Sequence, residues 1–379
     1  MCSGTYAENL SVVSAVNVHG GFSCSSWSYA ASNKVEIVAQ TDAPALTLKG
    51  MTSPVFVSDV QLVAKNDVGT GKSSVAAFVA SSVKVNFNRV KIEAKAGGDA
   101  EDGKNGSFTY PAGFLLFGKS ADDKGTPNNP QDDTGGAGGD TGSCPGGGRS
   151  AGGAGGNSGG NPGGDGNSTS GLDGAGGTFA ACEGRLGAVG FSAAPARGAR
   201  ALGSLTSEGW SGRAGEKGGA GGPGGAGGGG LGREGGGGGG GAGGCGGEGG
   251  GGGGAGGSSI ALLVLDSEVT LSASELVAGD AKQGGAGGAG QVGQNGGIGG
   301  SPTVISCGGA AGQSGGSGGH GGGGAGGVSA GIVWSGSREP ARDAATKIRA
   351  SAAAAPGGAG ASSAQDGVAG VNAEVLELP

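Results

Sequence analysis

Short stretches in which apolar and polar residues alternate recur through the first hundred residues of the chain. They are rich in β-branched side chains and cover residues 10–12, 16–18, 35–37, 46–48, 55–57, 83–87 and 90–92. An alternation of period two predicts strands with one buried face, and the Gly, Asn, Asp and Ser residues between the stretches predict turns. Because this part has no helical period, we expect an all-β fold, in which a solenoid, a sandwich and a barrel all remain open.

One of these patterns is repeated far along the chain. Residues 73–98 read SSVAAFVASSVKVNFNRVKIEAKAGG, and residues 258–280 read SSIALLVLDSEVTLSASELVAGD. With a gap of two residues, the alignment superposes three apolar pairs, which are Val85 and Val269, Phe87 and Leu271, and Ile92 and Leu276. Partial copies occur at 113–117 and at 331–334, and the last copy continues to 347–350.

Units that bury an apolar face only by stacking on one another are the signature of a solenoid. We therefore predict a parallel β-solenoid. After each fuller copy the chain turns to glycine, so we expect long glycine-rich arms that leave the solenoid at one equivalent corner. The expected segments are solenoid rungs at 1–118, a glycine-rich insertion at 119–257, a rung at 258–283, a glycine-triplet arm at 284–328, and terminal rungs with a short glycine-rich loop at 329–379.

Glycine recurs at every third position in runs 215–230, 232–256, 284–299 and 309–327. Three residues per turn is the period of the polyproline-II helix, so each run would present one bare edge. Such runs can pack as a polyglycine-II bundle, form a collagen triple helix or stay disordered. Collagen normally needs about 15–20% Pro or more, and this chain has 13 Pro in total.

The bundle and the disordered chain both remain open, because ordering glycine costs backbone entropy that inter-run hydrogen bonds roughly match. In a bundle, runs 284–299 and 309–327 would pair antiparallel, because the SPTVISCGG segment between them is long enough to reverse the chain. Each run would be roughly 50–60 Å long at ~3.1 Å per residue.

Composition and charge exclude several classes of function. Of 379 residues 103 are Gly and 4% are aromatic, so one compact core over the whole chain is excluded. The net charge of −7 and the absence of a basic patch exclude nucleic acid as a partner. Lys and Arg are scattered and no apolar run reaches the ~18 residues of a transmembrane helix, so we expect no membrane insertion.

Six cysteines are candidates for disulfides: Cys2, Cys24, Cys144, Cys182, Cys245 and Cys307. The sequence has no CxxC pair, and its histidines are His19 and His320, so zinc-site spacing is absent. An even count in a chain with little core favours disulfides in an oxidising compartment, with six unpaired thiols as the alternative. Proximity along the chain predicts the pairs Cys2–Cys24, Cys144–Cys182 and Cys245–Cys307.

The sequence offers no strong catalytic or cofactor motif. Residues 66–73 (NDVGTGKS) resemble the end of a phosphate-binding loop, but Asn66 stands where the motif needs Gly and a strand pattern follows, so we expect a solvated turn. Acidic clusters at 99–102, 122–123 and 132–140 could supply calcium ligands, but solvated loop charge is the preferred interpretation. We expect no metal and no cofactor.

Two further groups of residues bear on an enzymatic or a carbohydrate-binding role. Polysaccharide-cleaving solenoids group their acidic residues along a groove, whereas Asp59, Lys91 and Glu93 are isolated among small or apolar rung residues. The aromatic cluster that contains Trp27 and Tyr29 is expected to pack under a loop, with carbohydrate stacking as the alternative.

The opening of the chain resembles a known family. GTYAENL at 4–10, VNVHGGF at 16–22 and Trp27 are similar to the opening of right-handed parallel β-helix surface proteins of the pectin-lyase-like superfamily. The resemblance implies a right-handed solenoid and secretion or surface display, and the catalytic Asp residues of its enzymes find no match here. The glycine arms are similar to glycine-rich bacterial surface proteins and to polyglycine-II bundle proteins, which include antifreeze proteins and phage-adhesin tips.

We therefore expect a non-enzymatic structural or adhesive protein that is extracellular or lies on the exterior of the outer membrane. The alternatives are a carbohydrate- or ice-binding module displayed on the arms and a degenerate polysaccharide lyase or hydrolase. The sequence does not identify a partner, and extracellular polysaccharide and other surface components are the candidates. The N-terminus shows no signal sequence and starts inside what looks like a strand pattern, so we expect that an upstream segment is missing.

Overall fold

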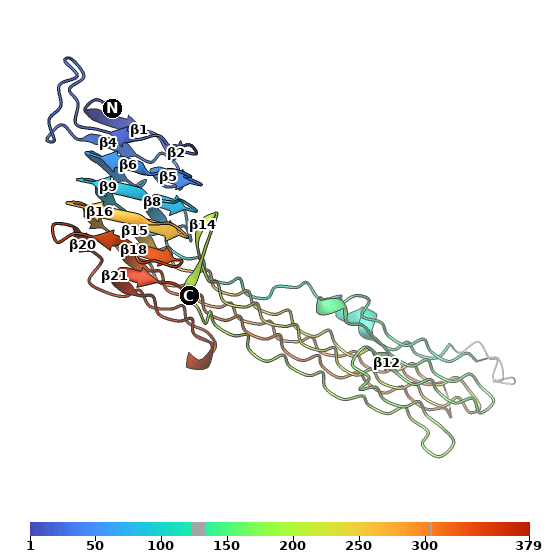
Figure 1. Ribbon diagram of the computed structural model, residues 1–379. Helices are drawn as coiled ribbons and strands as arrows, with labels where there is room; N and C mark the ends of the chain where they lie inside the picture. Colours follow the sequence, from blue (N-terminus) through green and yellow to red (C-terminus); the bar gives the residue numbers. More distant parts are fainter. Residues whose placement is uncertain (123–132, 304) are drawn as a thin grey trace.

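The structure is a computed structural model that describes residues 1–122, 133–303 and 305–379. It consists of a stack of parallel β-sheets and a long bundle of extended glycine-rich runs that projects from one side of the stack (Figure 1). The N-terminus lies at one end of the stack and the C-terminus near the other. Within the described residues, no helix has both the length and the apolar character needed to cross a membrane.

Three sheets build the stack, and their strands pair in parallel. Sheet 1 contains β1 (Gly4–Ala7), β4 (Val35–Val38), β7 (Val60–Val63), β10 (Lys91–Glu93), β17 (Glu275–Val277) and β20 (Lys347–Arg349). Sheet 2 contains β2 (Leu10–Val12), β5 (Leu46–Lys49), β8 (Ser74–Ala80), β15 (Ser259–Leu265), β18 (Ser329–Ser335) and β21 (Asn372–Glu377). Sheet 3 contains β3 (Val18–His19), β6 (Val55–Ser58), β9 (Val85–Asn88), β16 (Val269–Ser272) and β19 (Ala341–Arg342).

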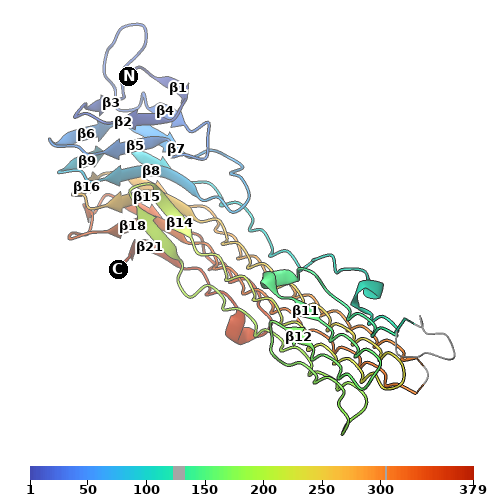
Figure 2. The ribbon, with the colours of Figure 1, turned by 90° about the vertical axis from the view of Figure 1, so that its right-hand side faces the viewer.

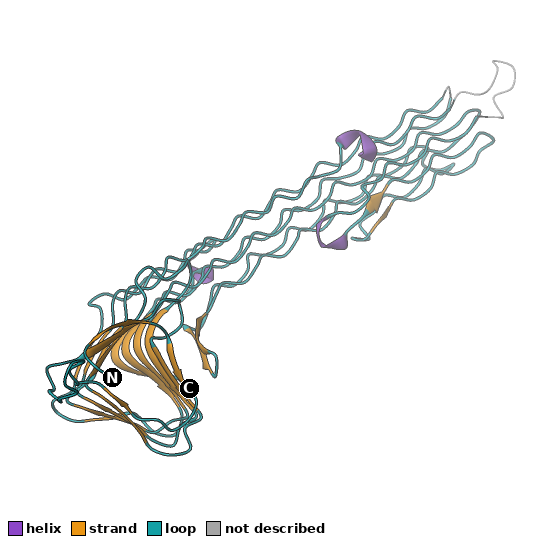
Figure 3. Ribbon diagram, turned by 90° about the horizontal axis from the view of Figure 1, so that it is seen from above, coloured by secondary structure: helices purple, strands orange, loops and turns teal. Residues whose placement is uncertain are grey.

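The chain visits these sheets in rotation. Strands β1, β2 and β3 lie in sheets 1, 2 and 3, and each later set of strands repeats this order one layer further along the stack. Figure 3 looks down the stack and shows the layers overlying one another. This all-β arrangement of parallel sheets is compatible with a parallel β-solenoid.

The internal repeat predicted from the sequence is confirmed by the strand register. Strand β9 pairs with β16 and β10 pairs with β17, and the three apolar pairs aligned in the sequence are Cα partners in these ladders. The copy at 331–334 lies within β18, and the continuation at 347–350 contains β20.

The copy predicted at 113–117 is wrong. Residues Gly113–Leu116 form a short 3₁₀ helix, η1, within the glycine-rich bundle. The Leu116 side chain is fully buried there, and its carbonyl accepts a hydrogen bond from Ala242 N at 2.8 Å. A short apolar run has no period of its own, so the sequence could not distinguish this anchor from a strand. The first series of rungs therefore ends at β10, and not near residue 118 as predicted.

Apolar residues at equivalent positions form ladders inside the stack. In sheet 1 one ladder runs through Tyr6, Ile37, Leu62, Ile92, Leu276 and Ile348. Its four middle members are fully buried, and burying such a side chain stabilises the fold by roughly 1.5–3 kcal/mol. Strand β7, which the sequence did not predict, supplies one position of this ladder.

Sheet 2 is apolar on its outer face as well. Strands β8, β15 and β18 are buried along nearly their whole lengths. The hairpin of β13 (Gly203–Thr206) and β14 (Gly209–Gly212) packs Leu205 and Trp210 against this face (Figure 2). The hairpin belongs to the long insertion, so the insertion covers the sheet from which it leaves.

All three glycine-rich segments leave the stack at the same corner, as the repeat predicted. They connect β10 with β15, β17 with β18, and β20 with β21, which in each case is the passage from sheet 1 to sheet 2. Together residues 97–122, 133–199, 213–257, 280–303, 305–328 and 355–370 form the glycine bundle (Figure 1).

Backbone hydrogen bonds at every third residue hold the glycine bundle together. Run 309–324 donates to run 285–300 in antiparallel order at 2.8 to 3.1 Å, which confirms the pairing predicted for 284–299 and 309–327. Run 215–230 donates to run 238–253 in antiparallel order at 2.8 to 2.9 Å. This is the pattern expected of polyglycine-II helices with three residues per turn.

Runs 213–230, 236–257 and 307–328 are the central runs of the bundle, and they are buried at 221–230, 235–247 and 321–328. Over different parts of its length, run 236–257 is bonded to runs at 98–119, 136–139, 150–156, 215–230, 285–300 and 307–325. A Cβ atom built on Gly239, Gly240 or Gly241 would lie 2.0 to 2.2 Å from a carbonyl oxygen, and each of these oxygens belongs to a different neighbouring run. Because consecutive residues face different runs, a fully surrounded run has to be nearly pure glycine.

Candidate functional site: a groove at the base of the glycine bundle

A polar groove runs along the bundle next to the stack, and we call it the base groove. It comprises cavities of about 590, 470 and 300 Å³. The first and third share Thr70, and the second and third share Glu101 and Gly254, so the three adjoin one another.

The walls and floor of the base groove come from separate parts of the chain. Residues 101–105 and Ser107 form one wall, residues 210–212 and Lys217 form the other, and glycines of run 236–257 form the floor. The walls carry both signs of charge, in Glu101, Asp102, Lys104 and Lys217. A bare glycine floor between charged walls allows a polar ligand to approach the backbone closely.

Glu248 ties the two walls together across this floor. Its Oε2 accepts a hydrogen bond from Ser107 N at 3.1 Å, and its Oε1 lies 3.5 Å from Lys217 Nζ. The backbone N–H of Ser107, and to a smaller extent the ammonium group of Lys217, lower the pKa of the Glu248 carboxyl. Glu248 is therefore ionised at neutral pH.

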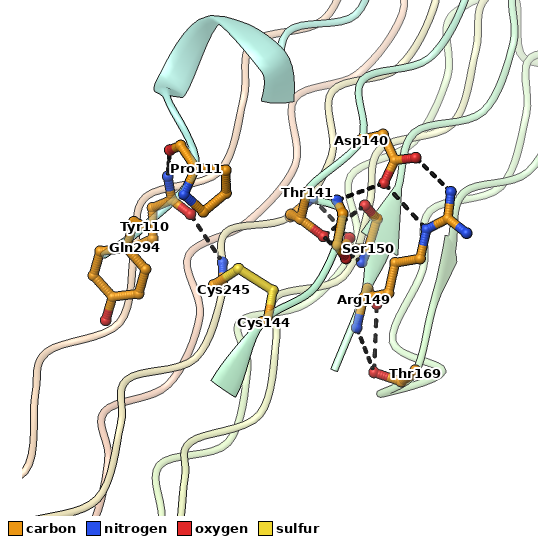
Figure 4. The surroundings of a disulfide bond; sticks show 12 residues. Tyr110, Pro111, Asp140, Thr141, Cys144, Arg149, Ser150, Thr169, Cys245 and Gln294 are labelled. Carbon is orange, nitrogen blue, oxygen red and sulfur yellow. Dashed lines mark hydrogen bonds and ion pairs between the residues drawn. A yellow bond between two sulfur atoms is a disulfide. The ribbon is translucent and has the colours of Figure 1, made fainter. Parts of the chain in front are cut away.

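A turn closed by a disulfide lies beside run 236–257 at Cys245 (Figure 4). Residues 140–150, which contain η3 (Pro145–Gly147), form this turn, and Cys144 is bonded to Cys245 with a Cα–Cα distance of 5.3 Å. The Asp140 carboxylate accepts hydrogen bonds from Gly142 N at 2.8 Å and from Arg149 Nε at 3.1 Å. The Arg149 guanidinium lowers the pKa of Asp140.

The disulfide pattern corrects two of the three predicted pairs. Cys2–Cys24 is confirmed, with a Cα–Cα distance of 4.9 Å. The predicted pairs Cys144–Cys182 and Cys245–Cys307 are wrong, because Cys144 pairs with Cys245 and Cys182 pairs with Cys307. Proximity along the chain fails here because the bundle places runs side by side that are 101 and 125 residues apart. Three disulfides indicate an oxidising environment.

Serine side chains fix the chain at the corner where the glycine segments leave. Ser74, Ser259 and Ser329 open strands β8, β15 and β18, occupy equivalent register positions and are fully buried. Their hydroxyl oxygens accept hydrogen bonds from Lys95 N, Gly279 N and Ser351 N at 2.7 to 2.9 Å. These bonds hold the first residues of each segment against the stack.

A second polar cluster lies at the corner between sheets 3 and 1. Asp59 is buried with a φ of 56°, and its carboxylate accepts hydrogen bonds from Arg89 Nε at 2.7 Å and from the Tyr29 hydroxyl at 2.9 Å. The Arg89 guanidinium is the main cause that lowers the pKa of Asp59. This carboxylate is paired and serves to attach the N-terminal loop.

The aromatic cluster of that loop is only partly covered. The ring of Phe22 lies 6.1 Å from that of Trp27 and 5.7 Å from that of Tyr29. Trp27 is 63% exposed, so it is not the buried residue expected from the sequence.

The other candidates from the sequence are dispersed. Residues 66–73 lead through a turn into β8 and line the base groove, in agreement with the expected turn. Within the described residues, no group of three or more His, Cys, Asp or Glu side chains could hold a metal ion. Asp123 and Asp132 lie outside the described residues. His19 lies in β3, whereas His320 lies in a central run of the bundle.

Comparisons with protein-family models, with curated proteins and with solved structures found no match to this chain. The resemblance of the N-terminal residues to pectin-lyase-like proteins therefore stays a prediction.

Proposed function

We propose that this chain is a non-enzymatic structural or adhesive protein of the extracellular space or the outer cell surface. In this proposal the sheet stack is a right-handed parallel β-solenoid that serves as a base, and the glycine bundle is a stiff projection. The observation that carries the proposal is the bundle itself, which extends away from the stack, is hydrogen-bonded along its length and is crosslinked by two disulfides.

Disulfides that join distant runs support a location outside the cytoplasm, because thiols are kept reduced inside most cells. A long projection held by backbone hydrogen bonds needs no enzyme-like pocket to act as a spacer or tip. These features support a mechanical role over a catalytic one.

The test uses intact cells that carry the protein. After alkylation without a reducing agent, we expect all six cysteines to be unmodified, and protease added outside the cells should remove the protein. Free thiols together with full protection from the protease would overturn the proposal. A cytoplasmic protein of known abundance serves as the control for cell lysis.

A carbohydrate-binding module is the second candidate, and the exposed Trp27 and Tyr29 favour it, since aromatic faces stack on sugar rings. Retention of the purified protein on immobilised polysaccharide, lost in Trp27→Ala and kept in Trp210→Phe, would support this module. Release of reducing ends from the same polysaccharide would favour an enzyme instead.

A further inference from the structure

The last strand of sheet 2, β21, carries charge at a position that is apolar in every other strand of that sheet. The register aligns Glu377 with a column of inward-facing residues, which are Val12, Leu48, Val79, Val264 and Trp334. From Leu48 to Trp334 the column is buried in the core of the stack. The Glu377 side chain, in contrast, is exposed at the end of the stack away from the N-terminus (Figure 1).

Glu374 interrupts a second column in the same way. It occupies the position of Gly331 in β18, Ala261 in β15 and Ala76 in β8, all of which are buried. The space beside this column is small, since a Cβ atom on Gly331 would lie 2.1 Å from Ile348 Cγ2. The Glu374 side chain is exposed instead, and neither carboxylate forms an ion pair with another described residue.

The backbone at this end of the stack could otherwise accept a further strand, because β20 and β21 are each paired on one side only. Asn372 opens β21 at the register position of the three buried serines that open β8, β15 and β18. Each serine accepts an N–H from a residue two positions beyond the next strand of sheet 1. The Oδ1 of Asn372 is buried and has no hydrogen-bond partner among the described residues.

The opposite end of the stack presents the matching donor. Asn9 lies two positions beyond β1, and its backbone N–H likewise has no partner within the described part of the chain. The half-buried side chains of Leu10 and Val375 belong to one apolar column and end it at opposite ends of the stack. The two ends therefore complement each other in register, in hydrogen bonding and in part of their apolar surface.

A second copy of this chain is the occupant that such ends would fit. Its β1 would follow β20 and its β2 would follow β21, so that Leu10 would lie on Val375 and the unpartnered donor and acceptor would meet. The same register would bury Glu377 against Val12. Burying an unpaired carboxylate carries a large free-energy cost, and inward-pointing charges are a known means of protecting a sheet edge from pairing.

We propose that Glu374 and Glu377 close the stack and keep copies of this chain from joining end to end. Without these carboxylates the contact would use a different surface on each copy, so it would not close on itself and would grow into a filament. The inference goes beyond the proposed structural role, because it assigns the control of assembly to two side chains. It holds or fails independently of the cellular location, since it concerns the purified protein.

The test compares the oxidised full-length protein with the variant Glu374→Ala/Glu377→Val. These substitutions supply the residue types that β8 and β15 carry at the same positions. We expect the unchanged protein to stay monomeric in sedimentation velocity. The variant should form a series of oligomers that lengthens with concentration, with a dissociation constant lower by about a hundredfold or more. Electron microscopy should show rods that carry one glycine bundle per copy.

Two further variants separate this contact from a general effect of charge. Glu183 and Glu216 are exposed residues of the glycine bundle, so Glu183→Ala/Glu216→Val makes the same change in net charge away from the stack and should stay monomeric. Val12→Glu, added to the associating variant, places a carboxylate on the other side of the same contact and should restore the monomer. Thermal unfolding of each variant checks that it is folded.

Several results would overturn the proposal. A folded, monomeric Glu374→Ala/Glu377→Val protein would show that the carboxylates do not hold copies apart, and so would end-to-end association of the unchanged protein. Equal association of the Glu183→Ala/Glu216→Val control, association that Val12→Glu leaves intact, or a dimer that does not grow with concentration would place the contact elsewhere on the molecule.

Discussion

At the scale of single residues, the surroundings of each glycine decide whether a side chain is tolerated. A Cβ atom on Gly241, a buried residue of run 236–257, would lie 2.1 Å from Gly297 O, whereas one on Gly219, an exposed residue of run 213–230, would meet Ala193 Cβ at 3.6 Å. The first contact is a collision with backbone and the second is an ordinary van der Waals distance. Both residues stand in glycine-rich sequence, so composition alone does not separate them.

We expect Gly241→Ala to destabilise the bundle by about 1–3 kcal/mol, as overpacking of a well-filled interior does. Gly219→Ala is the matched control and should leave stability unchanged or raise it by up to about 1 kcal/mol, because alanine restricts the unfolded chain. Denaturant unfolding followed by amide exchange in the bundle measures both. Equal stability of the two variants would contradict the close packing of the central runs.

The carboxylate of Asp59 gives a prediction about pH. Because Arg89 and Tyr29 lower the pKa of Asp59 in the folded protein, its ionised form stabilises the fold above the unfolded-state pKa of about 3.9. This contribution is lost as the pH falls through the folded-state pKa. Asp59→Asn should therefore cost about 1–3 kcal/mol at pH 7 and much less in acid. Thermal unfolding of both proteins at pH 7 and about pH 3 checks this, and a difference independent of pH would contradict it.

At the scale of elements, the two disulfides of the bundle join runs that the sequence places far apart. Removal of a crosslink that closes so long a loop costs about 2–5 kcal/mol in the entropic account. We expect the Cys182→Ser/Cys307→Ser variant to lose amide protection in runs 184–199 and 307–327 while the strands of the stack keep theirs. The control, Cys2→Ser/Cys24→Ser, should loosen the N-terminal loop and leave the bundle unchanged. Equal protection in the bundle with and without Cys182–Cys307 would contradict the role assigned to this disulfide.

The β13–β14 hairpin stabilises the fold by packing against sheet 2. Trp210 packs against the outer face of sheet 2, and its Nε1 donates to Ser258 Oγ at 2.9 Å. Trp210→Ala should cost about 2–4 kcal/mol and expose the apolar face, which promotes association. Trp27→Ala removes an exposed ring and should do neither. Sedimentation at several protein concentrations distinguishes the two, and a monomeric Trp210→Ala protein of unchanged stability would contradict the docking.

At the scale of the whole molecule, the structure predicts that the bundle is a stiff rod attached to a stack. Amide exchange of the oxidised protein should show protection at the bonded glycines of runs 215–230, 238–256 and 309–324 as well as in the strands. Small-angle scattering should give an elongated particle with a constant cross-section. Protection confined to the strands would mean that the glycine-rich segments are flexible and would remove the basis for a mechanical role.

Much of the fold could be predicted from local sequence patterns, because strands and glycine runs depend on the spacing of side chains along one stretch of chain. The alternation of apolar residues marks strands β2, β4, β5, β6, β9 and β10, and the internal repeat supplies the register of β9 and β10 on β16 and β17. The glycine period indicates runs with three residues per turn, and the reversing segment between 284–299 and 309–327 predicts their antiparallel pairing if a bundle forms. The corner at which the glycine-rich segments leave follows from where they interrupt the repeat.

The sequence by itself determined the strand pattern, the repeat and the three-residue period, since each depends on the spacing of side chains along one stretch of chain. The tertiary structure alone decided the disulfide partners of Cys144 and Cys182, the anchoring of Leu116 in the bundle and the base groove. These features depend on which runs lie beside one another after the chain has doubled back. Glycine-rich runs present nearly identical edges, so sequence gives no preference among neighbours, and the two disulfides that crosslink the bundle join residues 101 and 125 positions apart.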